Sequence, residues 1–203
     1  MNHINKTTLP AIGSVLSGGF FAGLFRNGDQ LHALIVSPKA EGEFIDIAWG
    51  EYPQEVDGAD SCFDGRSNTL AMAAAGSGLA KRILALRIAD LDDWYLPSRD
   101  ELEICYRNLK PTTEQNWCSF RDGDNASSVP VSYPYTKTSP AQTSVEAFQQ
   151  GNAEAFEPRW HWSSTQYSAH CAFFQYFDTG HQCGNAKGNE YCARAVRRLS
   201  VIE

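Results

Sequence analysis

Two apolar segments near the start of the chain, separated by turn-forming residues, predict a β-hairpin. Residues 20–25 and 31–36 are almost wholly apolar, and the polar residues between them include Asn27-Gly28. Asn-Gly is the strongest short turn signal, because both residues tolerate the positive φ of a two-residue hairpin turn. Residues 39–66 contain scattered Gly, Asp and Pro without periodicity, and we expect them to be irregular.

Apolar residues at helical spacing predict two helices in the middle of the chain. The first is expected over residues 68–86, although Gly76 and Gly78 weaken it because glycine is a poor helix former. The second begins at Ser98-Arg-Asp-Glu101, which has the pattern of a capping box, and ends before Pro111. Its apolar stripe consists of Leu102, Cys105 and Leu109.

The second half of the chain is predicted to contain a long ordered loop followed by strands. Residues 111–159 are rich in Pro, Ser, Thr, Asn and Gly, with a short helix expected at 144–149. Strands are expected at 161–165, 172–178, 181–183 and 192–199, with turns at 179–180 and 184–188. This order predicts a single α+β domain over residues 1–203, with residues 1–18 as a candidate attachment or oligomerisation segment.

The C-terminal strands are unusually aromatic. Eight of the 32 residues from Trp160 to Tyr191 are aromatic, twice the chain's average of 12%. Alternation along residues 172–178 places Phe174, Tyr176 and Asp178 on one face, opposite Phe173, Gln175 and Phe177. Such a strand is either buried on both faces or has one core face and one binding face. The polar residues on both faces favour the second interpretation, with Phe174, Tyr176 and Asp178 exposed.

Charge and hydropathy exclude several classes of protein. The formal net charge of -7 and the scattered basic residues argue against nucleic-acid binding, which needs clustered Lys and Arg. The apolar segments are shorter than the roughly 20 residues that a transmembrane helix needs, so we expect no membrane insertion. Residues 9–24 lack a convincing signal-peptide cleavage site, which favours an uncleaved product synthesised in the cytoplasm.

Cysteine, histidine and acidic residues give weak signals for a metal. The six cysteines contain no C-x-x-C motif, so free thiols are expected. His170-Cys171 and His181-x-Cys183 lack the usual spacing of zinc ligands. Asp122 and Asp124 resemble part of a calcium loop, but no bidentate Glu follows at the EF-hand position, and the same residues form ordinary turns. No phosphate-binding, dinucleotide-binding or nucleophile motif is present, and no cofactor is expected.

Three motifs together resemble a known family. They are Trp94-Tyr-Leu-Pro before the second predicted helix, Trp162-Ser-Ser-Thr165, and Arg194-Ala-Val-Arg-Arg198. This combination resembles the C-type-lectin-fold family of phage and prophage tail proteins, which includes the C-terminal domain of the Legionella collagen-like adhesin. Within that family the chain is most similar to the variable proteins of diversity-generating retroelements. The resemblance implies the formylglycine-generating-enzyme-like variant of the C-type lectin fold, with two helices packed on small antiparallel sheets.

The resemblance also implies a ligand-binding surface between Trp162 and the last strand, carried by a fixed scaffold. The implied scaffold residues are Ala172, Phe173, Gln175, Phe177, Gly180 and Gln182. Strand alternation adds Asp178 to the residues that the family leaves free. The predicted variable surface therefore comprises His170, Cys171, Phe174, Tyr176, Asp178, Thr179, His181, Cys183, Gly184, Asn185, Ala186, Gly188, Asn189, Tyr191 and Cys192.

These inferences predict a binding protein rather than an enzyme. The expected role is the receptor-binding tip of a phage or prophage tail fibre, located in the virion tail, which recognises a bacterial surface protein or glycan. It would act as a fibre subunit or a homo-oligomer such as a trimer. Two alternatives stay open. One is a formylglycine-generating type of enzyme using Cys183 and Cys192, and the other is a structural domain whose aromatic surface packs against another subunit.

Overall fold

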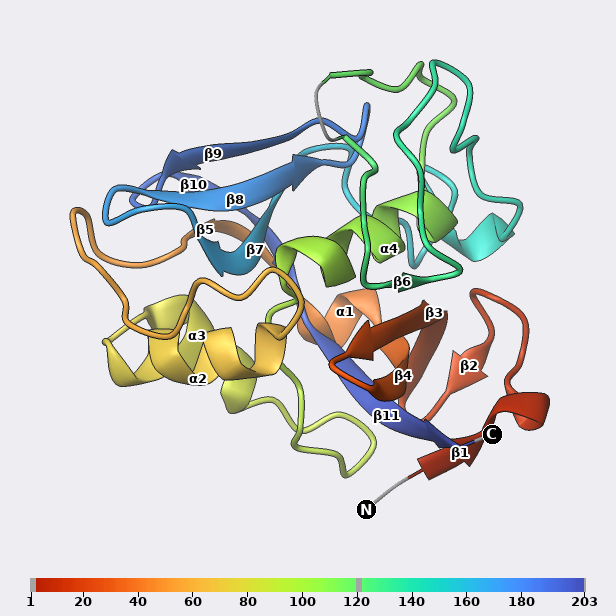
Figure 1. Cartoon of the computed structure of the whole chain (residues 1–203), viewed down its shortest axis with the longest axis horizontal. Coiled ribbons are helices and arrows are strands. Elements are labelled where there is room, and N and C mark those ends of the chain that lie inside the picture. The colour runs from red at the N-terminus through yellow and green to blue at the C-terminus, as the bar shows by residue number, and fades with distance from the viewer. Residues whose placement is uncertain (1–2, 120–121, 203) are drawn as a thin grey trace.

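The computed structural model describes residues 3–119 and 122–202, which form two β-sheets and four α-helices (Figure 1). The six-stranded sheet has the order β1-β11-β4-β3-β2, and β6 pairs with β3. Its strands are β1 (His3–Asn5), β2 (Val15–Leu16), β3 (Gly19–Asn27), β4 (Gln30–Val36), β6 (Ser128–Val129) and β11 (Val196–Ile202). This mixture of sheets and helices confirms the predicted α+β class.

The five-stranded sheet carries the aromatic C-terminal segment and has the order β5-β10-β7-β8-β9. Its strands are β5 (Glu43–Ala48), β7 (Trp160–Gln166), β8 (Cys171–Tyr176), β9 (Gln182–Ala186) and β10 (Glu190–Arg194). The helices are α1 (Lys39–Gly42), α2 (Gly65–Ala74), α3 (Gly78–Leu84) and α4 (Arg99–Leu109), with 3-10 turns at Lys6–Thr8 and Glu146–Phe148.

The hairpin and the second predicted helix are confirmed. Asn27 lies opposite Gln30, so β3 and β4 are joined by the tight turn at Gly28. Ser98 and Glu101 form a complete capping box at the start of α4, and the stripe of Leu102, Cys105 and Leu109 is buried. Helix α4 contacts both sheets and lies between them (Figure 1). It is therefore the element that connects the two halves of the core.

The first predicted helix is wrong in its bounds and its continuity. Asp64 caps α2 by accepting a hydrogen bond from the Ser67 backbone N–H, which starts the helix at Gly65. Gly76 has a φ of 109°, a conformation that ends a helix. Ser77 then caps a separate helix, α3, through the Ala80 N–H. Together with the single turn α1, this gives four α-helices rather than the two expected.

Several strand predictions also need correction. Residues 43–48 are not irregular, because β5 pairs with β10 as the edge strand of the five-stranded sheet. The predicted strand at 192–199 is interrupted at Ala195, and its two halves, β10 and β11, belong to different sheets. The predicted turn at 184–188 begins later, since β9 continues to Ala186.

Two pairs of strands are parallel, so the sheets are not purely antiparallel. β1 runs parallel to β11, and β10 runs parallel to β7. The pairing of β1 with β11 also bears on residues 1–18, the candidate attachment or oligomerisation segment. Within that segment β1 and β2 are strands of the six-stranded sheet, so its described part is built into the domain and does not project from it.

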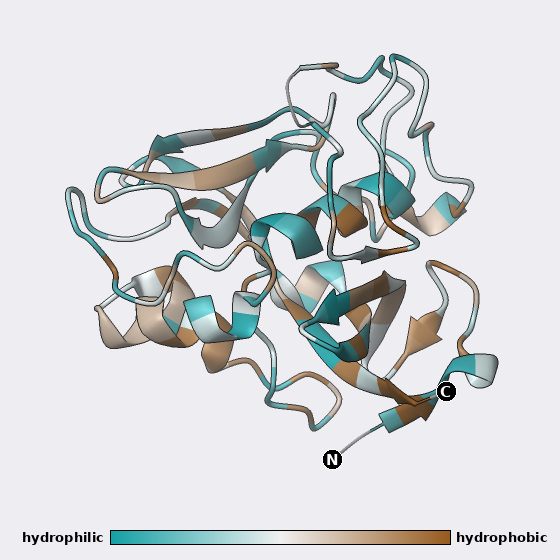
Figure 2. Cartoon of the chain, in the orientation of Figure 1, coloured by the Kyte–Doolittle hydropathy of each residue, from teal (hydrophilic) through white to brown (hydrophobic). Residues whose placement is uncertain are grey.

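Apolar side chains gather on the strands and helices, whereas the loops over residues 111–159 are mostly hydrophilic (Figure 2). One buried cluster joins α2 and α3 to both sheets, and a second surrounds α4. No helix within the described part of the chain combines the length and apolar character needed to cross a bilayer.

Two glycines at the first positions of helices are expected to respond oppositely to substitution. A Cβ on Gly65 would lie 2.5 Å from the Ser98 backbone nitrogen and 2.6 Å from the Leu96 carbonyl oxygen. Neither backbone atom can move cheaply, so Gly65→Ala should lower the free energy of unfolding by about 1–3 kcal/mol. A Cβ on Gly78 meets no atom within 4 Å. Gly78→Ala should therefore raise stability by about 0.5 kcal/mol through helix propensity and unfolded-state entropy. Urea unfolding checks both signs, and a stable Gly65→Ala variant would contradict the packing described.

Candidate functional site

The residues predicted for the variable surface lie on the hairpin formed by β8 and β9, its flanking turns and the start of β10, drawn in blue in Figure 1. All but two of them keep part of their surface accessible to solvent. His170, Cys183, Gly188 and Asn189 are the most exposed. The half-buried ones are Cys171, Tyr176, Asp178, Thr179, His181, Gly184, Asn185, Ala186 and Tyr191.

Phe174 and Cys192 do not belong to the exposed surface, which corrects the prediction for both. Phe174 is only 5% exposed, because the indole ring of Trp160 stacks on it with centroids 5.0 Å apart. Cys192 lies on β10, between β5 and β7, and is fully buried. Gln175, next to Phe174, is also buried. The middle of β8 is therefore buried on both faces, which is the first of the two interpretations that its alternating pattern allowed.

Three partly exposed aromatic side chains lie on adjacent strands of this sheet. Trp160 on β7 pairs across the ladder with Tyr176 on β8, and their ring centroids are 6.2 Å apart. Tyr191 on β10 approaches the Trp160 ring from the other side, with a centroid distance of 4.8 Å. Each tyrosine ring is inclined at 85° to the indole. Both tyrosine rings are therefore T-shaped relative to the indole.

A hollow of about 350 Å³ opens beside these rings. Its lining combines the three aromatic residues with Pro158, Arg159 and Glu190. Of the six lining residues, only Tyr176 and Tyr191 were among the predicted site residues. Pro158 and Arg159 precede β7 and Trp160 begins it, so all three lie before the predicted segment. Glu190 begins β10 inside that segment but was not among the predicted residues. One available signal was the spacing of Trp160 and Trp162, which places both side chains on one face of a strand.

Polar groups surround the two tyrosines. The Tyr191 hydroxyl accepts a hydrogen bond from the Asn185 side chain at 2.6 Å, and Asn185 also accepts one from Asn189 at 3.1 Å. Burial raises the pKa of Tyr191. Burial and the neighbouring Asp178 carboxylate raise the pKa of Tyr176. Both phenols are therefore neutral at physiological pH.

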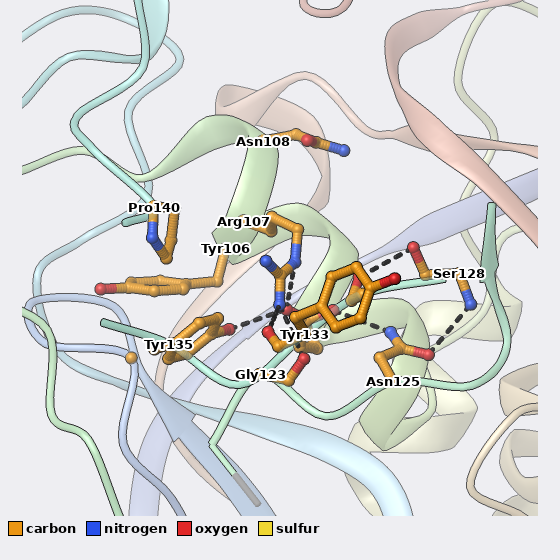
Figure 3. A network of polar contacts seen from close by, with 12 residues as sticks. Tyr106, Arg107, Asn108, Gly123, Asn125, Ser128, Tyr133, Tyr135 and Pro140 are labelled. Atoms are coloured by element: carbon orange, nitrogen blue, oxygen red, sulfur yellow. Dashed lines mark hydrogen bonds and ion pairs between the residues drawn. The ribbon is translucent and has the colours of Figure 1, made fainter. Parts of the chain in front are cut away.

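A polar network links helix α4 to the long loop (Figure 3) and reaches the inner face of β8 through Gln175. The Gln175 side chain donates to the Tyr135 hydroxyl at 3.1 Å, and Tyr135 donates to Glu103 on α4 at 2.9 Å. Arg107 forms an ion pair with Glu103 at 2.8 Å and donates to the carbonyl oxygens of Gly123 and Tyr133. These contacts connect both the long loop and β8 to α4, so the inner face of the hairpin is anchored to that helix.

The calcium and zinc interpretations find no support in the geometry. The Asp122 carboxylate is buried and accepts the backbone N–H of Gln182 at 3.0 Å, with the His181 ring 3.4 Å away. It serves to fix the start of β9 to the long loop, whereas Asp124 is exposed. Among the described residues, no group of three or more His, Cys, Asp or Glu side chains is arranged to hold a metal ion.

The two cysteines required by the enzyme alternative lie on separated strands. Cys183 is on β9 and Cys192 on β10, with β8 and β7 between them. Three strand spacings amount to roughly 14 Å, while a disulfide needs Cα atoms within about 7 Å of each other. Burial also raises the pKa of Cys192 to about 12, which keeps it a thiol. All six cysteines are free in the structure.

No protein-family model matches this chain, and the search of curated proteins finds no relative either. The site is therefore judged by its residues and their geometry.

Proposed function

We propose that this chain is a ligand-binding domain of the C-type lectin fold, in its formylglycine-generating-enzyme-like variant. It acts as the receptor-binding tip of a phage or prophage tail fibre and is diversified by a retroelement. Its ligand is a bacterial surface protein or glycan, bound through the β8–β9 hairpin and the start of β10. Several copies on one fibre, as in a trimer, raise the avidity of a weak single site.

One observation carries this proposal. The hairpin presents accessible aromatic and small polar side chains outward, while its inner face is fixed by hydrogen bonds to α4 and the long loop. Tyr and Trp offer large contact areas at little cost in rotamer entropy, and small polar residues adapt to different partners. An outer surface open to substitution on a rigid support is the arrangement that a diversified receptor-binding protein needs.

The binding role predicts a specific loss on mutation. Labelled protein is tested against a panel of intact bacterial cells by flow cytometry and against arrayed bacterial glycans. Tyr176→Ala should weaken binding at least about ten-fold, as expected for an aromatic interface hot spot, with little change in the melting temperature. Phe174→Ala should instead lower stability by about 3–5 kcal/mol, because it empties a packed position.

Tyr133→Ala is the matched control, since Tyr133 is 77% exposed and lies on the long loop, where it lines a different hollow with Leu24 of β3. This variant should bind as the wild type does. Equal losses at Tyr133 and Tyr176, or unfolding of the Tyr176→Ala variant, would rule out the assigned surface.

The retroelement is tested separately by sequencing the DNA beside the gene. We expect a reverse transcriptase and a near-copy of the codons for residues 160–198 that differs mainly at adenines. If both are absent, the diversification part of the proposal is wrong, whereas the binding assay still decides the rest.

A further inference from the structure

The hollow beside Trp160 is bordered by three aromatic side chains. Three rings from three neighbouring strands line it, and the rings of Tyr176 and Tyr191 stand nearly perpendicular to the indole. Phe174 covers the indole from within the sheet, so the Trp160 side chain, 39% exposed, is held in place while part of it stays accessible. Aromatic rings carry electron-rich faces, so a hollow bordered by three of them offers π surface to a guest.

The charges of the lining favour a positively charged guest. Arg159 is engaged in an ion pair with Asp46, which neutralises the one basic group. Glu190 is exposed, and its carboxylate has no hydrogen-bond or ion-pair partner within residues 3–119 and 122–202. Burial and the nearby Asp178 carboxylate, a further negative group, raise the pKa of the Tyr176 phenol. The unopposed charge at the hollow is thus negative.

We propose that this hollow binds an organic cation of the quaternary or alkylated ammonium class, held by cation–π contacts to Trp160, Tyr176 and Tyr191 and by the carboxylate of Glu190. Aromatic cages of this composition recognise alkylated ammonium groups because a cation within about 6 Å of a ring centroid is attracted by the ring quadrupole. A choline head or a methylated amine on a surface component has this chemistry. The inference deepens the proposed function, on whose receptor-binding surface it rests.

A saccharide fits the lining less well. Sugar recognition relies on several fixed polar groups around a ring face. Here Arg159 forms an ion pair with Asp46, and the Tyr191 hydroxyl accepts a hydrogen bond from Asn185. Glu190 therefore remains as the single unengaged charged group in the lining.

The test compares choline with 3,3-dimethylbutan-1-ol, a neutral compound of the same shape, on the full chain. Binding is followed by the shift of the Trp160 indole N–H resonance, assigned with Trp160→Phe. We expect choline to bind at least about ten-fold more tightly than the neutral analogue, because cation–π attraction requires the charge. Equal binding of the two, or no shift with either, would overturn the proposal.

Variants separate the contributions of the rings and the carboxylate. Tyr176→Leu should weaken choline binding about 3- to 30-fold, whereas Tyr176→Phe, which keeps the ring, should retain most of it. Glu190→Gln, at an exposed position, should weaken choline binding about two- to five-fold and leave the neutral analogue unaffected. Equal effects of Tyr176→Leu and Tyr176→Phe would argue against cation–π binding.

Further ligands distinguish the source of the cation from the site itself. Phosphocholine, phosphatidylcholine vesicles and a trimethyllysine peptide are titrated in the same way. Because these titrations need no cellular receptor, their failure overturns only the cation site, provided cell binding remains sensitive to Tyr176→Ala. If the wild-type protein binds choline but binds no bacterial cells, the receptor role is overturned instead.

Discussion

Arg194→Met is expected to lower the free energy of unfolding by about 3–5 kcal/mol. Arg194 is 1% exposed, and its guanidinium donates to the Ser37 carbonyl oxygen at 2.7 Å and to the Glu154 carboxylate at 2.8 Å. It also lies over the Phe156 ring. Removing one partner of a buried pair leaves the other charge and the freed carbonyl groups uncompensated in a medium of low dielectric constant.

The matched control is Arg87→Met, which breaks an ion pair with Asp92 between side chains that are 61% and 69% exposed. Water and salt screen such pairs, so the loss should stay below about 0.5–1 kcal/mol. Urea unfolding with a shared slope measures both variants. Similar losses at the two arginines would show that Arg194 is not the buried link between β10, the Ser37 segment and the long loop.

Glu101 is expected to make the protein less stable as the pH rises from about 4.5 to about 7. Burial raises the pKa of this carboxyl to about 7, against the opposing effect of hydrogen bonds from Tyr95 and Ser98. The folded state therefore keeps the proton to a higher pH than the unfolded state, whose ordinary value is 4.5. In this window the folded state binds more protons, so stability falls with rising pH, by up to about 3 kcal/mol in total.

Glu101→Gln removes this titration while preserving the geometry of the capping box. In the wild type, Gly65 and Ser98 donate their backbone N–H groups to one carboxylate oxygen of Glu101, and the Tyr95 hydroxyl donates to the other. We expect the amide oxygen of the variant to accept the two N–H groups and its amide nitrogen to donate to the Tyr95 hydroxyl. We expect the stability difference between this variant and the wild type to change steadily across the window. Glu51→Gln, at an exposed position, should leave the pH dependence of the wild type unchanged. A constant difference between wild type and Glu101→Gln would contradict the raised pKa.

Predictions from local sequence succeeded where neighbouring residues alone decide the conformation. Asn27-Gly28 makes its turn, and Ser98 and Glu101 cap α4 through contacts made within one helical turn. The split of the first predicted helix shows the limit of such reasoning. A single positive φ at Gly76 ends α2, and a run of apolar residues alone does not reveal it.

Alternation along β8 placed Phe174 and Tyr176 on one face correctly, yet their exposure differs. Phe174 is buried because Trp160 from the neighbouring strand stacks on it, whereas Tyr176 lies at the strand end and borders the hollow. Burial depends on which strands flank β8, and a two-residue period carries no information about flanking strands.

The sequence by itself determined the α+β class, the hairpin, helix α4 and the segment that carries the aromatic surface, because these follow from short-range patterns of polarity and turn chemistry. Only the tertiary structure decided that β10 lies beside β7 and β7 beside β8. That order brings Trp160, Tyr176 and the neighbouring pair Glu190 and Tyr191 together, although these three positions are distant along the chain. Strand order arises from the packing of the whole core, so no local pattern specifies it.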